Sequence, residues 1–268
     1  MKETTVRSWV HRSILVTVLW AAIAAADLGQ EKDGELSAGV KSRIGWWETS
    51  KEQYDHQTFR DGYFDPTTIE SRESDVGFLV GPELKYTYRS LFARGFYLWG
   101  DYGLSDGGDA NLENLGVDVG FYSREGMRGL HAGLFLGYRE FDASFTGLVD
   151  SQITDHSISD AVLGIMLGGK PQTPGFQWGI ELVMGLQGLV NVWDDDKYEE
   201  NPAVIEGEAT IGYRFEAIPL TVNVGYGVWS YADKAREYPY TPSIIIDKIV
   251  ERWEDWGHGV ILNVNYSF

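Results

Sequence analysis

The last ten residues of the chain, 259–268, alternate between apolar and polar side chains and end on an aromatic residue. One face of an extended strand would carry Val260, Leu262, Val264, Tyr266 and Phe268, and the other Ile261, Asn263, Asn265 and Ser267. Successive side chains of a β-strand point to opposite faces. The pattern therefore predicts a strand that faces membrane lipid on one side and a polar interior on the other.

The same alternation recurs in ten segments, each long enough to cross a membrane as a tilted strand of ~9 to 11 residues. They lie near 35–48, 76–88, 91–102, 112–123, 129–142, 157–169, 175–190, 203–215, 219–231 and 257–268. An even number of antiparallel strands is typical of bacterial membrane barrels. The sequence predicts an all-β fold, a transmembrane antiparallel up-and-down β-barrel of about ten strands.

A soluble β-sandwich is the main alternative, because alternation within one segment is a weak signal. Aromatic residues near the strand ends on the apolar face favour the membrane barrel, since such barrels carry aromatic girdles at both membrane surfaces. They are Trp46, Tyr86, Tyr88, Tyr138, Phe176, Trp178, Tyr213, Phe215, Tyr266 and Phe268.

The connections between the ten segments alternate in length. The short ones are 89–90, 124–128, 170–174 and 216–218, and the long ones are 49–75, 103–111, 143–156, 191–202 and 232–256. Short periplasmic turns and long extracellular loops are expected of a bacterial barrel. The long connections hold 22 acidic and 8 basic residues, a net charge of −14 out of −18 for the whole chain. The outer rim is therefore predicted to be strongly acidic.

The amino-terminal segment has the features of a secretory signal. Lys2, Arg7 and Arg12 precede the apolar stretch 14–23, and alanines before position 27 offer a cleavage site. Ten apolar residues are too few for a membrane-spanning helix, which needs ~20. We expect residues 1–26 to be a signal peptide that is removed, and residues 27–268 to form a single domain.

Composition narrows the function. The net charge of −18 argues against nucleic acid as a partner. The chain contains no cysteine, so disulfides contribute nothing to its stability. No motif indicates a cofactor.

The residues of opposite parity to the apolar face are predicted to line the interior. They are Lys41, Arg43, Glu83, Lys85, Asp118, His131, Arg139, Asp160, Glu181, Gln187, Glu206, Glu208, Arg214, Asn223, Asn263 and Asn265. Buried charges need partners, so we expect a mutually neutralised network. Ten strands lie close to the size at which side chains fill the barrel, so the network forms either a polar plug or a narrow path for small solutes. The third segment is ambiguous in phase, and either Arg94 or Asp101 points inward.

Two kinds of outer-membrane enzyme provide further alternatives. The chain resembles the omptin proteases in strand number, and that family's pattern pairs Asp-x-Asp with Asp-x-His at the barrel mouth. Asp194 and Asp196 have the first spacing, but no Asp-x-His occurs, and Asp155-His156 is wrongly spaced for one strand face. Outer-membrane enzymes that deacylate lipid A carry a His-x-Ser pair, with the serine two positions after the histidine. His156 is followed by serines at one and three positions instead, so the sequence does not support this activity.

Three loop features complete the candidates. Asp106, Asp109, Asn111 and Glu113 form one oxygen-rich cluster, and 194–200 holds five carboxylates, but neither has the spacing of a dedicated Ca²⁺ loop. Residues 243–256 place Ile245, Ile249, Trp253 and Trp256 at helical spacing, which predicts a short amphipathic helix in the last loop.

Taken as a whole, the mature chain resembles the small bacterial outer-membrane β-barrel proteins. This resemblance implies an outer-membrane location and contact with lipid and lipopolysaccharide. It also implies recognition of the terminal Tyr266 and Phe268 by the barrel-assembly machinery, and we favour a monomer. Three functions follow: a noncatalytic barrel with an envelope or surface-interaction role, a narrow porin-like channel, or an outer-membrane enzyme.

Overall fold

A computed structural model describes residues 34–55, 67–123, 130–148, 151–169, 174–186, 203–232, 236–239 and 248–268. The expected signal peptide therefore lies outside the described residues. The strands are β1 (Gly34–Asp55), β2 (Thr67–Glu73), β3 (Gly77–Tyr88), β4 (Leu91–Gly103), β5 (Asp109–Tyr122), β6 (Leu130–Thr146), β7 (His156–Gly169), β8 (Gly175–Gly185), β9 (Ala203–Arg214), β10 (Leu220–Ala232), β11 (Arg236–Pro239) and β12 (Lys248–Ser267). Within this part of the chain, no helix is long and apolar enough to cross a membrane.

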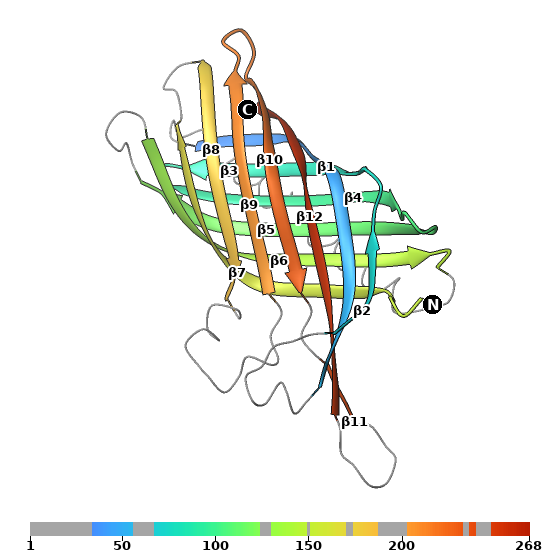
Figure 1. The fold of residues 1–268 in the computed structure, drawn as a ribbon. Coiled ribbons are helices and arrows are strands. Elements are labelled where there is room, and N and C mark those ends of the chain that lie inside the picture. The colour runs from blue at the N-terminus through green and yellow to red at the C-terminus, as the bar shows by residue number, and fades with distance from the viewer. Residues whose placement is uncertain are drawn as a thin grey trace, which may run out of the picture.

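Ten of the strands close into a ring (Figure 1). Neighbouring strands pair antiparallel in the order β12-β10-β9-β8-β7-β6-β5-β4-β3-β1, and β1 pairs with β12 to complete the circle. The predicted up-and-down barrel of ten antiparallel strands is confirmed. Closure leaves the ring without a free sheet edge, which is what allows a β-sheet to lie in lipid.

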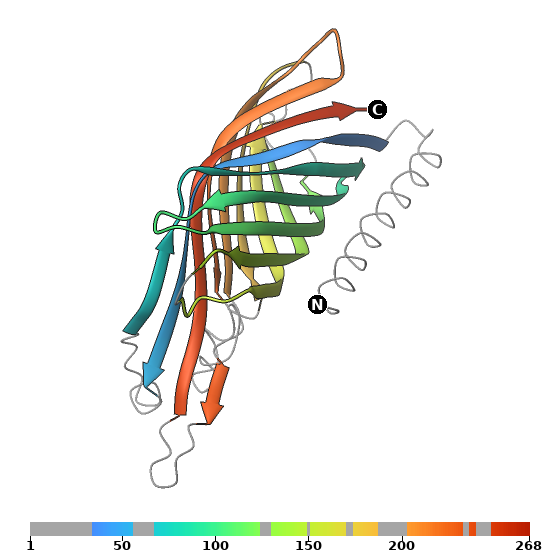
Figure 2. The ribbon, with the colours of Figure 1, turned by 90° about the vertical axis from the view of Figure 1, so that its right-hand side faces the viewer.

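The first and last ring strands are longer than predicted and extend beyond the ring. β2 pairs with the extension of β1 between Glu48 and Gln53, and β11 pairs with the extension of β12 between Lys248 and Glu251. These four segments form a projection at the long-loop end (Figure 2). We call this projection the outer extension.

The predicted helix at 243–256 is wrong for the residues that the structure describes. Residues 248–256 belong to β12, and Trp253 and Asp255 are buried while Trp256 is 44% exposed. Trp253 and Trp256, which the helical spacing would place on one face, therefore lie on two faces of a strand. The backbone N–H and C=O groups of this segment form hydrogen bonds with β1. This pairing outweighs the helical pattern, because a helix this short has little stability of its own. Positions 243–247 lie outside the described residues.

The outward positions of the ring form an apolar belt. Its exposed side chains include Val40, Ile44, Phe78, Val119, Phe121, Leu134, Leu136, Ile165, Leu167, Ile180, Leu182, Ile211, Val224, Val228, Val260 and Leu262. Aromatic side chains border the belt, with Trp46, Tyr138, Tyr226 and Trp256 towards the long loops and Phe176, Trp178, Tyr213, Phe215, Tyr266 and Phe268 towards the short turns. A continuous apolar surface of this size is unfavourable in water, so the belt is the membrane-facing surface.

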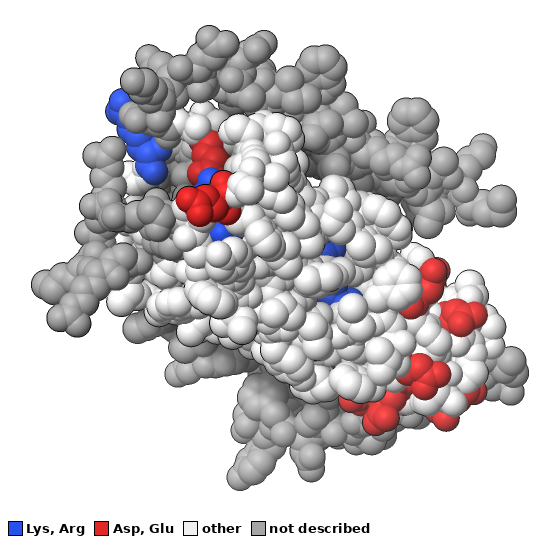
Figure 3. Space-filling model, turned by 90° about the horizontal axis from the view of Figure 1, so that it is seen from above, with Lys and Arg blue, Asp and Glu red and all other residues white. Residues whose placement is uncertain are grey.

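Beyond the belt, the outward positions become polar. Glu48, Asp101, Asp109, Asn111, Glu113, Glu140, Asp142 and Ser144 follow the apolar residues on β1, β4, β5 and β6. Figure 3 shows the same division, because the face in view is mostly uncharged and its acidic side chains gather mainly at one end. The segments that carry the belt are therefore the membrane-spanning ones. The polar outward positions just named lie outside them, and we call this group the acidic collar.

A row of glycines crosses the inner wall where the ring closes. Gly45 on β1 is in register with Gly77 on β3 and Gly259 on β12, and Gly259 is in register with Gly227 on β10. A Cβ at Gly45 would lie 2.0 Å from the carbonyl oxygen of His258. Only glycine allows this close approach between the backbones of β1 and β12.

The outer half of the interior is packed with apolar side chains. Its buried cluster includes Trp47, Leu79, Leu98, Tyr102, Leu112, Phe141, Ile158, Val162, Val183, Val204, Trp229 and Tyr231, and it continues to Phe96 and Phe135 beside the charged residues. The main group of predicted lining residues lies below these outer apolar side chains, towards the short turns.

Candidate functional site: the charge network across the barrel

The central feature of the interior is an ion-pair network that crosses from one wall to the other. Lys41 and Arg43 stand on β1, and their partners Glu206 and Glu208 stand on β9, which is separated from β1 by the ring strands β12 and β10. The Nζ atom of Lys41 lies 2.8 Å from Oε1 of Glu208. The NH2 atom of Arg43 lies 3.0 Å from Oε1 of Glu208 and 3.3 Å from Oε1 of Glu206. These bonds fasten β1 to β9 through the lumen.

A second cross-lumen tie is made by Arg139 on β6. Its guanidinium binds Asp118 on the neighbouring strand β5 at 2.6 Å and reaches Glu206 on β9 through Nε at 2.9 Å. The side chains of Arg139 and Asp118 are fully buried. Charges this deeply buried are tolerated only when their hydrogen-bonding groups are matched, and Arg139 meets two carboxylates at once.

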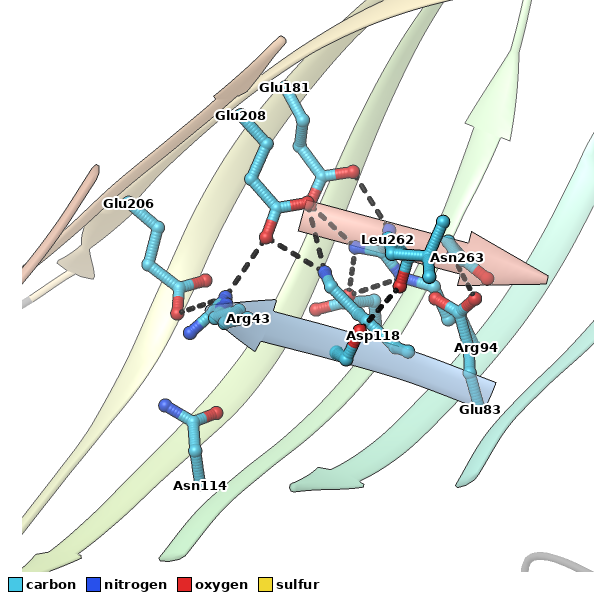
Figure 4. A network of polar contacts seen from close by, with 12 residues as sticks. Arg43, Glu83, Arg94, Asn114, Asp118, Glu181, Glu206, Glu208, Leu262 and Asn263 are labelled. Atoms are coloured by element: carbon cyan, nitrogen blue, oxygen red, sulfur yellow. Dashed lines mark hydrogen bonds and ion pairs between the residues drawn. The ribbon is translucent and has the colours of Figure 1, made fainter. Parts of the chain in front are cut away.

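Arg94 on β4 completes the network and resolves the ambiguous phase of the third predicted segment. Its guanidinium lies 2.5 Å from Asp118 and 2.7 Å from Glu181 on β8. Asp101 instead points outward, where it accepts a hydrogen bond from Asn111. Figure 4 shows the carboxylates of Glu181, Glu206 and Glu208 approaching the bases from one wall. The network thus joins bases of β1, β4 and β6 to acids of β5, β8 and β9.

Below the network, the charged side chains inside the barrel contact side-chain amides and aromatic rings. Glu83 accepts hydrogen bonds from Asn263 at 2.6 Å and Asn265 at 3.4 Å. The ammonium of Lys85 lies over the rings of Phe92 and Tyr122, 5.7 and 5.1 Å from their centroids. These contacts stabilise charge without forming ion pairs.

Arg214 and the carboxyl-terminal aromatics lie at the short-turn end. The NH2 atom of Arg214 is 3.5 Å from Glu35 in a partly exposed pair. Tyr266 and Phe268 are exposed on the outer surface, and their rings pack edge to face, 5.1 Å apart. Their proposed part in membrane assembly stays a prediction.

Above the network, hydrogen bonds of Tyr231 connect it to the apolar cluster. Tyr231 on β10 donates its hydroxyl hydrogen to Glu206, and its hydroxyl oxygen accepts from Asn114 on β5 at 2.5 Å. The Tyr231 ring stacks on Phe141, 4.6 Å away and almost parallel. Tyr231 therefore joins the charged and apolar layers of the interior.

Sequence reasoning missed a buried contact at the barrel mouth. Nε2 of His156, on β7, lies 2.6 Å from Oδ2 of Asp255 on β12. The carboxylate that binds this histidine is therefore Asp255 and not the adjacent Asp155. The Asp155 carboxylate instead accepts a hydrogen bond from the backbone N–H of Phe145. Nothing local marks the contact, because the two partners are 99 positions apart.

The oxygen-rich loop 106–113 is dispersed in the structure. Asp106 binds Arg72 at 3.4 Å, Asn111 donates to Asp101, and Glu113 accepts from Tyr97. Within the described residues, no group of three or more acidic, histidine or cysteine side chains is placed to hold a metal ion. Asp194, Asp196 and the rest of the second acidic cluster lie outside those residues.

Comparison with known proteins gives likenesses of fold at low sequence identity. No protein-family model matches the chain, and no curated protein matches it. Solved structures similar to it include the outer-membrane protease OmpT from Escherichia coli, at 7% identity over 87% of this chain and 97% of that chain, with a TM-score of 0.48. Another is Ail, the attachment invasion locus protein of Yersinia pestis, at 13% identity over 88% of this chain and 99% of that chain, TM-score 0.31.

The toluene transporter TodX of Pseudomonas putida is also similar, at 8% identity over 88% of this chain and 90% of that chain, with a TM-score of 0.30. Identities this low carry no activity over to this chain. The closed ring of strands and its apolar belt are themselves sufficient to establish the class to which this protein belongs. The chain is a transmembrane β-barrel of the bacterial outer-membrane type.

Proposed function

We propose that this protein is a sealed, noncatalytic outer-membrane barrel that anchors an acidic outer surface to the envelope and conducts no solutes. The observation that carries the proposal is the set of ties across the lumen, with the apolar cluster packed above them. An eight-stranded barrel is filled by its own side chains, and ten strands enclose only a little more space.

The filling is visible in the burial of large inward side chains. Those less than 2% exposed are Trp47, Arg43, Arg139, Tyr102, Tyr231, Phe135, Phe141, Leu79, Leu98, Leu112, Ile158 and Ile261. They come from strands on every side of the ring, so they fill its cross-section rather than coat one wall. A hydrated ion would have to separate buried ion pairs and then pass an apolar layer, both of which are costly.

The surface role is supported by the acidic collar and the outer extension. Both lie beyond the belt, where they meet the cell's surroundings, and net negative charge there favours divalent cations and basic partners. Contact with lipopolysaccharide, assembly through Tyr266 and Phe268, and a monomeric state form part of the same proposal.

The buried position of His156 supports a structural role for this residue. The side chains of His156 and Asp255 are only 2% and 0% exposed, so a substrate has no access to them in this arrangement. Catalysis requires the acting group to reach the reacting atoms.

A planar-bilayer recording of the refolded protein tests the sealed barrel. We expect silence from the native sequence, with folding verified by circular dichroism. A matched variant, Arg43→Ala and Arg139→Ala with Glu206→Ala and Glu208→Ala, removes both cross-lumen ties and should give discrete conductance steps if it folds. Stable steps from the native protein, with an ion preference altered by Lys41→Ala, would refute the proposal in favour of a narrow channel.

A further inference from the structure

The contact between His156 and Asp255 spans the mouth of the barrel. His156 is the first residue of β7, and three ring strands separate β7 from β12, where Asp255 lies. The bond therefore joins opposite parts of the rim, and it does so just where the segment 151–155 enters β7. Asp255 stands in register with Thr49 of β1, in the base of the outer extension.

The hydrogen-bond geometry fixes how many protons this pair carries. Nδ1 of His156 lies 2.9 Å from the backbone carbonyl oxygen of Thr154, which can only accept, so Nδ1 carries a hydrogen. The contact of 2.6 Å between Nε2 and the Asp255 oxygen needs a hydrogen as well, since two lone pairs at that distance repel. The pair thus holds one proton more than a neutral imidazole beside a carboxylate. It is either imidazolium with carboxylate or imidazole with carboxylic acid.

The surroundings keep water from replacing this bond. The rings of Phe145 and Trp253 flank the imidazole, with centroids 5.9 and 6.2 Å away. Among the described residues, the titratable groups that face the pair from the packed elements are Lys51 of β1, Tyr231 of β10 and Asp155 ahead of β7. Lys51 lies over Trp253, Tyr231 is in register with Asp255, and Asp155 is held by the Phe145 N–H.

We propose that His156 and Asp255 form a proton-operated latch, which holds the segment 151–155 and the start of β7 against the outer extension. The shared proton lets His156 donate to Asp255 and to the Thr154 carbonyl at once, and its loss opens the latch because one remaining hydrogen cannot satisfy both acceptors. An ordinary histidine titrates near pH ~6.5. Because the closed form carries the extra proton, it is favoured at lower pH, and its contribution is lost as pH rises.

Hydrogen exchange of the folded protein in detergent micelles tests the latch. Backbone amides of residues 151–158 are followed by mass spectrometry between pH 5.5 and 8.5, with rates corrected for intrinsic exchange. Loss of one buried hydrogen bond should reduce their protection about tenfold across this range. The ring of belt strands provides the internal reference, since its protection should stay constant.

Asp255→Asn is the diagnostic variant. Its amide can donate to Nε2 of a neutral imidazole, so the bond forms without the extra proton and protection should no longer depend on pH. His156→Gln, whose amide can donate to Asp255, serves the same purpose should the first variant fail to fold. Constant protection in the native protein, or an unchanged pH dependence in the folded variant, would overturn the latch. Neither result depends on whether the barrel conducts.

Discussion

At the scale of single residues, the interior is governed by the cost of burying charge. Arg139 is the clearest case, because it is fully buried and binds both Asp118 and Glu206. Exposed pairs contribute little to stability, whereas removal of one partner from a buried pair leaves a charge without compensation. Arg214, with 29% of its side chain exposed beside Glu35, provides the comparison.

Replacement of Arg139 by methionine should therefore destabilise the barrel by about 3 to 5 kcal/mol, because Glu206 loses one of its bases. The matched change Arg214→Met should cost less than about 1 kcal/mol. Urea unfolding in lipid vesicles, followed by tryptophan fluorescence, measures both. Equal effects of the two changes would show that the network contributes no more than a surface pair.

A second residue-scale prediction concerns Glu70 on β2, outside the membrane-spanning segments. Burial raises the pKa of its carboxyl, but hydrogen bonds from the Gln152 N–H, Ser151 and Arg72 outweigh this and lower the pKa overall. These bonds hold the segment 151–155, with Gln152 N at 2.6 Å and Ser151 Oγ at 2.7 Å. A carboxyl with a lowered pKa stabilises the fold above its unfolded value of ~4.3, and this stabilisation is lost as pH falls through the folded value.

Amide protection of 151–153 should accordingly fall on acidification below pH ~4.3. The variant Glu70→Gln should begin at a lower protection and lose this pH dependence. Hydrogen exchange in acid measures the effect, away from the range in which the latch acts. An acid response that persists in the variant would assign it to another group.

The residue scale also shows where sequence reasoning succeeds. Lys41 and Arg43 have the opposite parity to the apolar Val40 and Ile44, and Glu206 has the opposite parity to Ile205, so an inward direction is predicted; all three are buried inside the ring. The direction of Arg94 is ambiguous in the sequence, because apolar or aromatic residues occupy both parities around it, from Phe92 to Trp99. Where both faces of a strand are apolar, the alternation of residues does not show which face points inward. The direction of the Arg94 side chain then depends on its partner across the barrel.

At the scale of elements, the close approach of β1 and β12 depends on glycine. The row from Gly77 through Gly45 and Gly259 to Gly227 lets backbones approach where side chains would clash. Sequence patterns underestimate the lengths of β1 and β12, because their outer parts are polar outside the membrane and lose the apolar alternation. The structure shows that β1 and β12 remain paired in these outer parts, because the backbone hydrogen bonds between two strands do not require surrounding lipid.

The change Gly45→Ala should destabilise the fold by about 1 to 3 kcal/mol, the usual cost of overpacking, because its Cβ would meet the His258 carbonyl at 2.0 Å. Gly103→Ala is the control, since the nearest atom to its Cβ would be Asp75 Oδ2 at 3.7 Å. Urea unfolding midpoints of the two variants provide the measurement. A tolerated alanine at position 45 would mean that the strands do not approach so closely.

At the scale of the whole molecule, three layers follow one another along the bore. An apolar cluster lies towards the long loops, the charge network lies below it, and amides lie towards the short turns. The charged side chain at the short-turn end is the more exposed one, with 29% at Arg214 against 0% at Arg139 in the network. Sequence patterns predicted the ring and many inward charges, but the latch between positions 156 and 255 requires closure and register, which local patterns do not contain.

The central claim is that alternate residues of each ring strand face lipid and a closed interior. The chain has no cysteine, so single cysteines at positions 260 to 265 can carry spin labels as the only labelled sites. In lipid bilayers, labels at 260, 262 and 264 should be accessible to dissolved oxygen, and labels at 261, 263 and 265 should be shielded from it. Equal accessibility at all six positions would contradict the account.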